Sequence, residues 1–426
     1  MIRKIKAILL TLMATRWAPH FTKDARRAVQ SIRTGKLAQS TASRQLLVDV
    51  SIIAVHDAGT GIQRVVRSLL RELISEPPAG FVVRPVMATR KQRYRYADQY
   101  FSVLTGSAPP SAEAINVGQG DIFLGLDLTS RILPRRQADL LEWRAKGVRH
   151  AFVVYDLLPA TNPDWFTRRS SKFFQHWVTS ISIHADSLFC ISSSVAADVR
   201  RRLEDHHHLT NDQPAIHWFH LGADLPAQGL PPDPNEVDIS RLFEPSISRT
   251  VIMVGTVEPR KAHALVLDAF ECLWSSGVDV RLVIAGKQGW HVEDVVARLE
   301  KHPETGKRLI WLRDVSDATL TSLYAIADGF VMASEAEGFG LPLVEAAQFG
   351  TPLFVRDLPV FREIAGDNAT YFRERTGVEL APRLAAWLNQ IDESSAPNSS
   401  NMARLTWAES AQQLRTLLIE LDRTQA

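Results

Sequence analysis

Two glutamates flank a glycine-rich turn in the second half of the sequence. Glu337 and Glu345 begin and end the stretch "EGFGLPLVE". Pro342 suits the first turn of a helix, because its missing N–H has no intrahelical partner there, and Gly350 with Pro352 marks the helix end. Such a helix start has unbonded N–H groups and a partial positive charge, which favour an anion. Carboxylates accept hydrogen bonds from vicinal hydroxyls. The pattern therefore predicts a ligand with sugars near the two acids and phosphates between them.

A simpler interpretation of the two acids needs no ligand. A glutamate in the first helical turn complements the helix dipole, and one in the preceding loop can simply be solvated. A second short stretch presents the same choice. Gly59-Thr60-Gly61 follows a predicted strand and forms either a tight turn or a bare backbone for a ligand. Arg64 stands where a dinucleotide-binding loop has its third glycine, so that function is not indicated.

Composition limits the classes of protein that this chain can represent. With 426 residues it is too long for one hydrophobic core, so we expect two domains. The formal charge of +2 indicates no nucleic-acid partner. Cys190 and Cys272 lie among apolar residues, which is typical of a reducing compartment. No apolar run is long enough to cross a bilayer.

The first half of the sequence alternates strands with helices. Its strands are apolar throughout, which indicates a parallel sheet covered on both faces. Strands are expected over 44–54, 81–88, 121–128, the end of 141–159, and 186–194. Helices are expected over 62–73, the start of 141–159, 172–185 and 195–204. The helix over 62–73 is amphipathic, with its apolar residues on one stripe.

The same alternation restarts after a segment rich in proline and aspartate. Strands are expected over 250–256, 280–286, 308–314, 329–334 and 352–357, and helices over 263–274, 292–302, 318–327, 342–350 and 406–422. The fold class is therefore α/β, with two tandem Rossmann-like, doubly wound domains. We place the first domain at 46–225, a linker at 226–248, the second domain at 249–404 and a C-terminal helix at 405–426. Ligands bind at the carboxyl ends of the strands in such sheets, so we expect a cleft between the two domains.

The first 45 residues are strongly basic. Asp24 is their only acid, against ten lysines and arginines, and Trp17 and Phe21 lie among the charges. Three interpretations remain open. The segment is a signal peptide, a disordered or loosely packed basic arm, or an interfacial segment attracted to anionic lipid. The last would suit an enzyme with a membrane-held substrate.

Four motifs of the second half resemble those of one enzyme family. The stretch from Glu337 to Glu345 resembles the E-x7-E signature of family 4 retaining glycosyltransferases, which have the GT-B fold of two facing Rossmann-like domains. "VGTVEPRKAH" (254–263), "GKQGW" (286–290) and "RDLPVFREIAGDNATYF" (356–372) agree with it. In the first half, "TGIQRVVRSLL" and "YDLLPATNPDWF" resemble bacterial mannosyltransferases that build O-antigen and exopolysaccharide. The resemblance covers roughly 46–421 and implies that the C-terminal helix crosses back to the first domain.

The resemblance implies roles for residues of the second domain. Arg260 and Lys261 would bind the donor diphosphate, and Glu337 would act near the donor sugar. The other donor residues divide into a sugar-binding and a nucleoside-binding group. The sugar group is Gly338, Phe339, Gly340 and Leu341, and the nucleoside group is Glu345, Val315 and Trp290, of which Trp290 could equally be core.

In the first domain the resemblance implies two further site residues. The bare backbone at Gly61 would approach the donor diphosphate. Asp156 ends a predicted strand and becomes the acceptor-side catalytic residue, with His56-Asp57 as a second candidate. Relatives often have histidine before this aspartate, where this chain has Tyr155. Because relatives retain the anomeric configuration without a protein nucleophile, Glu337 is expected to act electrostatically, unlike the paired acids of glycoside hydrolases.

The implied function is a metal-independent, retaining hexosyltransferase without a cofactor. Its donor would be a nucleotide sugar, GDP-mannose by subgroup, with UDP- and dTDP-sugars left open. Its acceptor would be a lipid-linked saccharide, reached in the cytoplasm or at the cytoplasmic face of the inner membrane. No Asp-x-Asp metal motif occurs, and His206-His207-His208 is expected to be an exposed polar loop. The alternatives are an inactive nucleotide-sugar-binding scaffold and, less favoured for want of its motifs, a phosphorylase or epimerase of the same fold.

Overall fold

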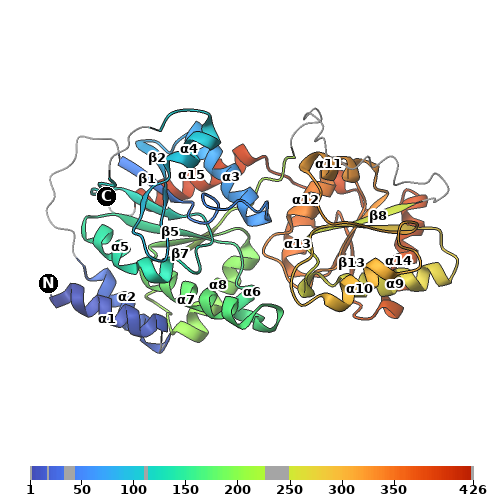
Figure 1. The fold of residues 1–426 in the computed structure, drawn as a ribbon, viewed down its shortest axis with the longest axis horizontal. Helices are drawn as coiled ribbons and strands as arrows, with labels where there is room; N and C mark the ends of the chain where they lie inside the picture. The colour runs from blue at the N-terminus through green and yellow to red at the C-terminus, as the bar shows by residue number, and fades with distance from the viewer. Residues whose placement is uncertain (1, 17–18, 33–43, 110–113, 226–248, 424–426) are drawn as a thin grey trace. The chain divides into compact units, whose positions relative to one another are not determined.

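The computed structural model describes residues 2–16, 19–32, 44–109, 114–225 and 249–423. The linker expected over 226–248 and Trp17 lie outside the described residues. The chain forms two compact units (Figure 1). The first unit comprises Met1–Gly222 with Leu405–Ala426, and the second comprises Ala223–Arg404.

The first unit is built on a seven-stranded sheet in the order β3-β2-β1-β4-β5-β6-β7. All neighbours are parallel except β2 and β3. The strands are β1 (Arg44–Asp49), β2 (Phe81–Met87), β3 (Arg95–Tyr96), β4 (Ile122–Gly125), β5 (Arg149–Val154), β6 (Ser187–Cys190) and β7 (Ala215–Trp218). The short strands β3 and β7 were not predicted. Strand β1 lies between β2 and β4, so the strand order reverses at β1.

The first strand ends earlier than its apolar run predicts. The chain leaves β1 at Asp49 and turns over 51–55. The reason is Asp127, which follows β4 and whose carboxylate accepts hydrogen bonds from the N–H groups of Ile52 (2.7 Å) and Ile53 (2.9 Å). These bonds replace the ladder bonds that a longer strand would make, so the prediction of a strand to residue 54 is wrong.

Helices cover the first sheet on both faces. They are α3 (Gly61–Ser75), α4 (Asp98–Thr105), α5 (Leu133–Ala145), α6 (Leu158–Thr161), α7 (Arg168–His184), α8 (Ser193–His207) and α15 (Trp407–Arg423). A capping box between Thr60 and Gln63 starts α3, which buries the predicted apolar stripe. Helix α15 packs against α3 (Figure 1). The expected return of the C-terminal helix to the first domain is thereby confirmed.

The basic N-terminal segment contributes two helices to the first unit. They are α1 (Ile2–Arg16) and α2 (Thr22–Gln30), and both pack against α7 (Figure 1). Small buried residues, including Ala7, Ala14 and Ala25, allow the close approach. Arg26 is 6% exposed and donates to the carbonyls of Ser182 (3.1 Å) and Ala185 (2.6 Å), at the end of α7. The described part of this segment therefore differs from a loosely packed arm, because its Arg26 donates hydrogen bonds to backbone carbonyls at the end of α7.

The histidine run also differs from its expectation as an exposed loop. His206 and His207 lie in the last turn of α8, and His208 ends the helix with φ 53°. His207 is 3% exposed, and its Nδ1 lies 3.3 Å from the Thr22 hydroxyl. The segment thus belongs partly to the packing of α2 against α8 within the first unit.

The second unit is built on a six-stranded, fully parallel sheet in the order β10-β9-β8-β11-β12-β13. The strands are β8 (Thr250–Val254), β9 (Arg281–Ala285), β10 (Leu309–Leu312), β11 (Gly329–Met332), β12 (Leu353–Arg356) and β13 (Thr370–Phe372). The helices are α9 (His263–Ser275), α10 (Glu293–Lys301), α11 (Asp317–Ile326), α12 (Leu341–Gln348), α13 (Pro359–Ala365) and α14 (Gly377–Asp392). Only β13, which has three residues, was not predicted as a strand. The order of the strands reverses between β8 and β11, the place where doubly wound sheets bind ligands.

None of the described helices is both long and apolar enough to span a bilayer. Cys190 and Cys272 are both free thiols, and Cys190 is buried.

Candidate functional site

The basic pair lies at the carboxyl end of β8. Arg260 and Lys261 form most of the short 3-10 helix η4 (Pro259–Lys261), and Ala262 with φ 56° turns the chain into α9. Gly255 follows β8 directly and has φ +139°. A Cβ atom at Gly255 would lie 3.4 Å from Lys261 Cε, an ordinary contact distance, so it is the positive φ that favours glycine there. The local sequence therefore holds both cations close to the sheet.

The acidic turn lies at the carboxyl end of the neighbouring strand, β11. Gly340 precedes α12 with φ +99°, a conformation that favours glycine, and its Cβ position is only 2.9 Å from Phe361 Cε1. Pro342 occupies the first turn of α12, as the sequence predicts. Phe339 is 4% exposed, whereas Leu341 is only partly buried. The backbone is thus held in a fixed turn in front of the start of α12.

The structure joins these two loops through one buried cluster of charges. Glu337 accepts from Lys261 Nζ at 2.5 Å and from Arg260 Nη1 at 2.9 Å. Arg260 Nη2 also lies 2.6 Å from Glu258 Oε1. The four side chains are between 5% and 18% exposed. The Glu335 N–H donates to the Arg260 carbonyl at 2.7 Å, so the backbones of the two loops are bound together as well.

Electrostatics keep Glu337 ionised. Burial raises the pKa of its carboxyl, but Arg260 and Lys261 outweigh burial and lower that pKa to about 2. Burial raises the pKa of Glu258, against the opposing effect of the same two cations. Glu337 therefore carries a full negative charge near neutral pH and is not available as a general acid there.

Glu345 lies in α12 and is fixed by a neighbouring helix. The residue is 2% exposed, and its Oε2 accepts from the Tyr324 hydroxyl of α11 at 2.9 Å. The Tyr324 ring is itself fully buried and stacks on Phe349 at 6.0 Å between centroids. Sequence reasoning did not identify Tyr324, because its apolar stripe on α11 reads as core.

Trp290 and Val315 come from the loops after β9 and β10. Both residues are partly buried. The loop after β9 is bound to the loop after β8, because the Gly289 N–H donates to the Val257 carbonyl at 2.8 Å. A Cβ atom at Gly289 would lie 2.7 Å from that same oxygen. Strands β10, β9, β8 and β11 lie side by side in this order and are all parallel. The loops that carry the expected donor residues therefore all leave the same edge of the sheet.

Glu258 is the principal residue of this cluster that sequence reasoning missed. It precedes Pro259-Arg260-Lys261 directly, and that acid-before-base order is the signal that could have identified it. Its role differs from that of Glu337, since it pairs with Arg260 alone among the contacts given above. Among the described residues, no group of His, Cys, Asp or Glu side chains is arranged to hold a metal ion.

The two remaining expected site residues belong to the first unit. Asp156 follows β5, and its Oδ1 accepts from the Leu158 N–H at 2.9 Å. Tyr155 is 5% exposed, and its hydroxyl donates to the Leu126 carbonyl at 2.7 Å. Tyr155, which departs from the family pattern, thus joins β5 to the end of β4 through a buried hydrogen bond.

Gly61 lies in the first unit, at the start of α3. It is exposed and is the first residue of α3, and a Cβ there would meet no atom within 4 Å. The glycine whose conformation matters is Gly59, with φ +67°. Of the second candidate pair, Asp57 is bound to Arg67.

Comparisons with known proteins agree with this architecture. Residues 235–399 match the family model of glycosyl transferases group 1. The chain is 40% identical over 376 residues to the serotype-specific mannosyltransferase WbdA of Escherichia coli, which covers 87% of this chain and 44% of that protein. The O-antigen chain mannosyltransferase B of the same species is 32% identical over 38% of each chain. The chain thus spans less than half the length of the WbdA proteins that it matches.

Solved structures share the fold at low identity. Alr3699/HepE of Anabaena, solved with UDP and glucose, superposes with a TM-score of 0.55 and 15% identity over 89% of this chain and 98% of that chain. The catalytic domain of starch synthase IV from Arabidopsis thaliana gives a TM-score of 0.58 and 14% identity over 90% and 100%. Together with the two parallel sheets, these likenesses confirm the predicted GT-B fold class.

Proposed function

Because the second unit belongs to the glycosyl transferases group 1 family, we propose that this chain is a retaining, metal-independent hexosyltransferase. It transfers mannose from GDP-mannose to a lipid-linked oligosaccharide or polysaccharide in O-antigen or exopolysaccharide synthesis. The observation that carries the proposal is the buried Arg260–Lys261–Glu337 cluster at the carboxyl ends of β8 and β11. The 40% identity to a mannosyltransferase over 87% of the chain supports the choice of sugar.

The donor binds to the second unit in this proposal. Arg260 and Lys261 bind the diphosphate and stabilise the negative charge that develops on it as the sugar departs. The N–H groups of Phe339, Gly340 and Leu341, with Gly338, hold the phosphate and the sugar hydroxyls at the start of α12.

The nucleoside occupies the neighbouring loops of the same sheet edge. Glu345, oriented by Tyr324, accepts hydrogen bonds from the ribose hydroxyls. Trp290 and Val315 lie against the base. These roles need no metal ion, since the cations are supplied by the side chains.

Glu337 acts as an electrostatic partner and not as a nucleophile. Its charge is held by two cations, which lowers the pKa to about 2 and leaves little nucleophilic character. The acceptor then attacks on the face from which the diphosphate leaves, and the configuration is retained. Glu337 also orients Arg260 and Lys261, so its loss should weaken donor binding as well as turnover.

The acceptor binds to the first unit. Asp156, at the end of β5, binds the attacking hydroxyl, and the backbone at Gly61 approaches the donor diphosphate. Because the Tyr155 hydroxyl is bound to a backbone carbonyl, it does not replace the histidine of relatives as a sugar-binding group.

The enzyme works in the cytoplasm, in peripheral contact with the anionic inner membrane. The outward side of α1 carries Ile5, Leu9 and Met13, which are 49%, 56% and 37% exposed, four residues apart along the helix. This apolar stripe in a strongly basic segment is typical of an interfacial helix.

Calorimetric titration of the chain with GDP, UDP and dTDP tests the donor site. We expect micromolar binding of GDP that is lost in Lys261→Ala and Glu345→Ala, and slow hydrolysis of GDP-mannose by the wild type. Micromolar binding of UDP or dTDP in place of GDP would overturn the choice of donor. Binding without turnover, with or without acceptor, would identify an inactive nucleotide-sugar-binding scaffold. No binding of any nucleotide would overturn the site.

A further inference from the structure

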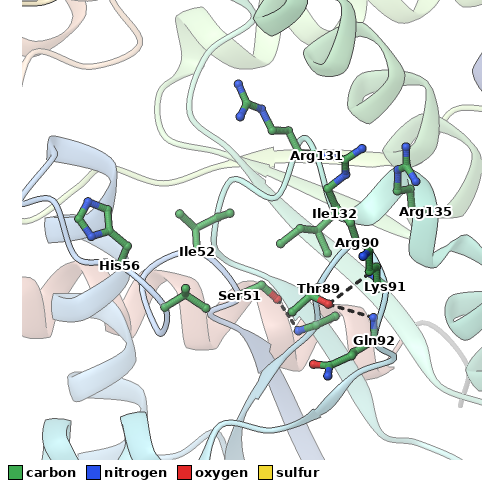
Figure 2. A pocket seen from close by; sticks show the side chains of 12 residues that line it. Ser51, Ile52, His56, Thr89, Arg90, Lys91, Gln92, Arg131, Ile132 and Arg135 are labelled. Carbon is green, nitrogen blue, oxygen red and sulfur yellow. Dashed lines mark hydrogen bonds between the residues drawn. The ribbon is translucent and has the colours of Figure 1, made fainter.

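The first unit contains a cavity of about 760 Å³ whose lining includes His56 but none of the residues given a role in the proposed function. Three segments line it (Figure 2): the turn after β1, the residues after β2, and the approach to α5. Because β1 lies between β2 and β4, this cavity lies where the strand order reverses. Ligands of doubly wound sheets bind at that place, at the carboxyl ends of the strands.

Basic side chains surround the cavity. Its charged lining residues are Arg90, Lys91, Arg131 and Arg135, and none of the described residues that line it is an aspartate or glutamate. Arg90 and Arg135 lie on one side of it, and His56 lies on the opposite side (Figure 2). Like charges that converge on a hollow in the surface raise the local positive potential, which selects an anion.

The protein neutralises neighbouring cations but not these four. Arg93, two residues beyond Lys91, pairs with Asp139 at 2.9 Å and with Glu142 at 2.5 Å. In the described parts of the chain, no carboxylate lies within ion-pair distance of the Arg90, Lys91, Arg131 or Arg135 side chains. A ligand anion would supply the missing counter-charge.

The floor of the cavity is rigid. The Ser51 hydroxyl accepts from the Ala88 N–H at 2.8 Å and donates to buried Asp49 at 2.5 Å, which binds the turn after β1 to the end of β2. Thr89 Oγ1 accepts from the N–H groups of Lys91 (3.2 Å) and Gln92 (2.9 Å), as Figure 2 shows. The loop that carries two of the four cations is therefore ordered before a ligand binds, which reduces the entropy lost on binding.

A second cavity, of about 270 Å³, shares Arg90 and Arg135 with the first. Its other side is formed by Ile8, Thr11 and Leu12 of α1. The two arginines thus lie between the large cavity at the strand ends and the residues of α1 that line the second cavity. The same helix exposes the apolar side chains of Ile5, Leu9 and Met13.

We propose that Arg90 and Arg135 bind the phosphate or diphosphate group that joins an acceptor saccharide to its lipid carrier. The saccharide occupies the large cavity, with Lys91 and Arg131 at its rim, and the lipid chain lies along α1. An apolar helix face, two guanidinium groups and a separate cavity follow one another in the order of lipid, phosphate and sugar in such a molecule. Guanidinium groups bind phosphate oxygens bidentately. This inference rests on the proposed function, since it names the anionic part of the acceptor.

Farnesyl diphosphate is the probe for this site, and inorganic diphosphate and farnesol are its two halves. We would titrate the full chain with each by calorimetry in the Lys261→Ala background, so that the proposed donor site does not bind the probe. We expect farnesyl diphosphate to bind at least tenfold more tightly than either half. In Arg90→Gln/Arg135→Gln its Kd should rise at least tenfold, while GDP binding, measured with Lys261 restored, stays unchanged. Arg90 and Arg135 are both exposed, so the substitutions leave the core intact.

Arg201→Gln is the matched control. It removes one positive charge from the same unit, on α8, where Arg201 is 71% exposed and pairs with Asp198. In the same Lys261→Ala background, its Kd for farnesyl diphosphate should equal that of Lys261→Ala alone.

Three outcomes would overturn the inference. One is unchanged binding in the double variant, and another is an equal loss in Arg201→Gln. The third is equal affinity for inorganic and farnesyl diphosphate, which would indicate a free phosphate compound. Failure of the wild type to bind GDP would refute the donor site alone, because the farnesyl diphosphate measurement does not depend on Lys261.

Discussion

Replacement of Glu337 by glutamine should destabilise the second unit strongly. The substitution keeps the shape of the side chain and removes the charge that faces both Arg260 and Lys261. Lowering the carboxyl pKa from 4.5 to about 2 corresponds to about 3 kcal/mol of stabilisation at neutral pH. The loss should be of that order, because the variant leaves Lys261, which is 8% exposed, without the carboxylate that now binds it.

The effect should also depend on pH with a definite sign. The pKa of Glu337 is lower in the folded than in the unfolded chain, so its contribution is fully present above pH about 4.5. It should fall as the pH falls from about 4.5 towards 2. The difference in stability between wild type and Glu337→Gln should therefore shrink over that interval.

Hydrogen exchange read by mass spectrometry can follow this unit separately. Peptides from β8 and β11 report the opening free energy of the second sheet without interference from the first unit. A loss of about 3 kcal/mol would accelerate their exchange on the order of 100-fold at neutral pH. Lys261→Met in the Glu337→Gln background should restore part of the loss, because it removes the buried unpaired cation.

Glu300→Gln provides the control for charge removal alone. Glu300 lies in α10 of the same unit, is 44% exposed and pairs with Arg313, so the change should cost less than about 0.5 kcal/mol. The reasoning would be refuted if Glu337→Gln behaved like Glu300→Gln. It would also be refuted if Lys261→Met and Glu337→Gln were additive in stability.

Three further predictions concern backbone strain, a buried hydrogen bond and a buried acid. Gly340→Ala should lower the free energy of unfolding in urea by about 1–3 kcal/mol, because φ is +99° and a ring atom lies 2.9 Å from the new Cβ. Gly61→Ala should change it by less than about 0.5 kcal/mol, and equal effects would contradict the reasoning. Tyr324→Phe should cost about 1–3 kcal/mol and weaken GDP binding through Glu345, by calorimetry; unaltered affinity would count against the role of Glu345. Burial raises the pKa of Asp49 to about 7, so the stability of the first unit should fall as the pH rises from about 4 to 7; Asp49→Asn should flatten this dependence, and an unchanged slope would exclude Asp49 as its source.

Local patterns were sufficient to predict most elements of both sheets. Apolar runs of four to seven residues, separated by helical periodicity, are visible in the sequence because burial on both faces requires them. The strands that escaped prediction, β3, β7 and β13, have two to four residues each and carry no such run.

Errors arose where a distant residue changed the path of the chain. The run over 44–54 is apolar enough for one strand, but Asp127 binds the N–H groups of Ile52 and Ile53 and turns the chain there. The predictions for the N-terminal segment depended on its charge, but its alanines and Arg26 pack onto α7. In both cases the partner lies far away in the sequence, so the segment alone does not reveal the contact.

The sequence by itself determined the α/β class, the order of the elements and the positions of the basic pair and the acidic turn. These follow from side-chain periodicity and from the residue types that begin and end helices, which act over a few residues. Only the tertiary structure decided which charges pair and which do not. Lys261 and Glu337 are 76 residues apart and meet because β8 and β11 are neighbours in the sheet, while Arg90 and Arg135 converge on a cavity without a carboxylate. An ion pair between residues so far apart in the sequence depends on the order of the strands in the sheet, which the folding of the whole unit establishes.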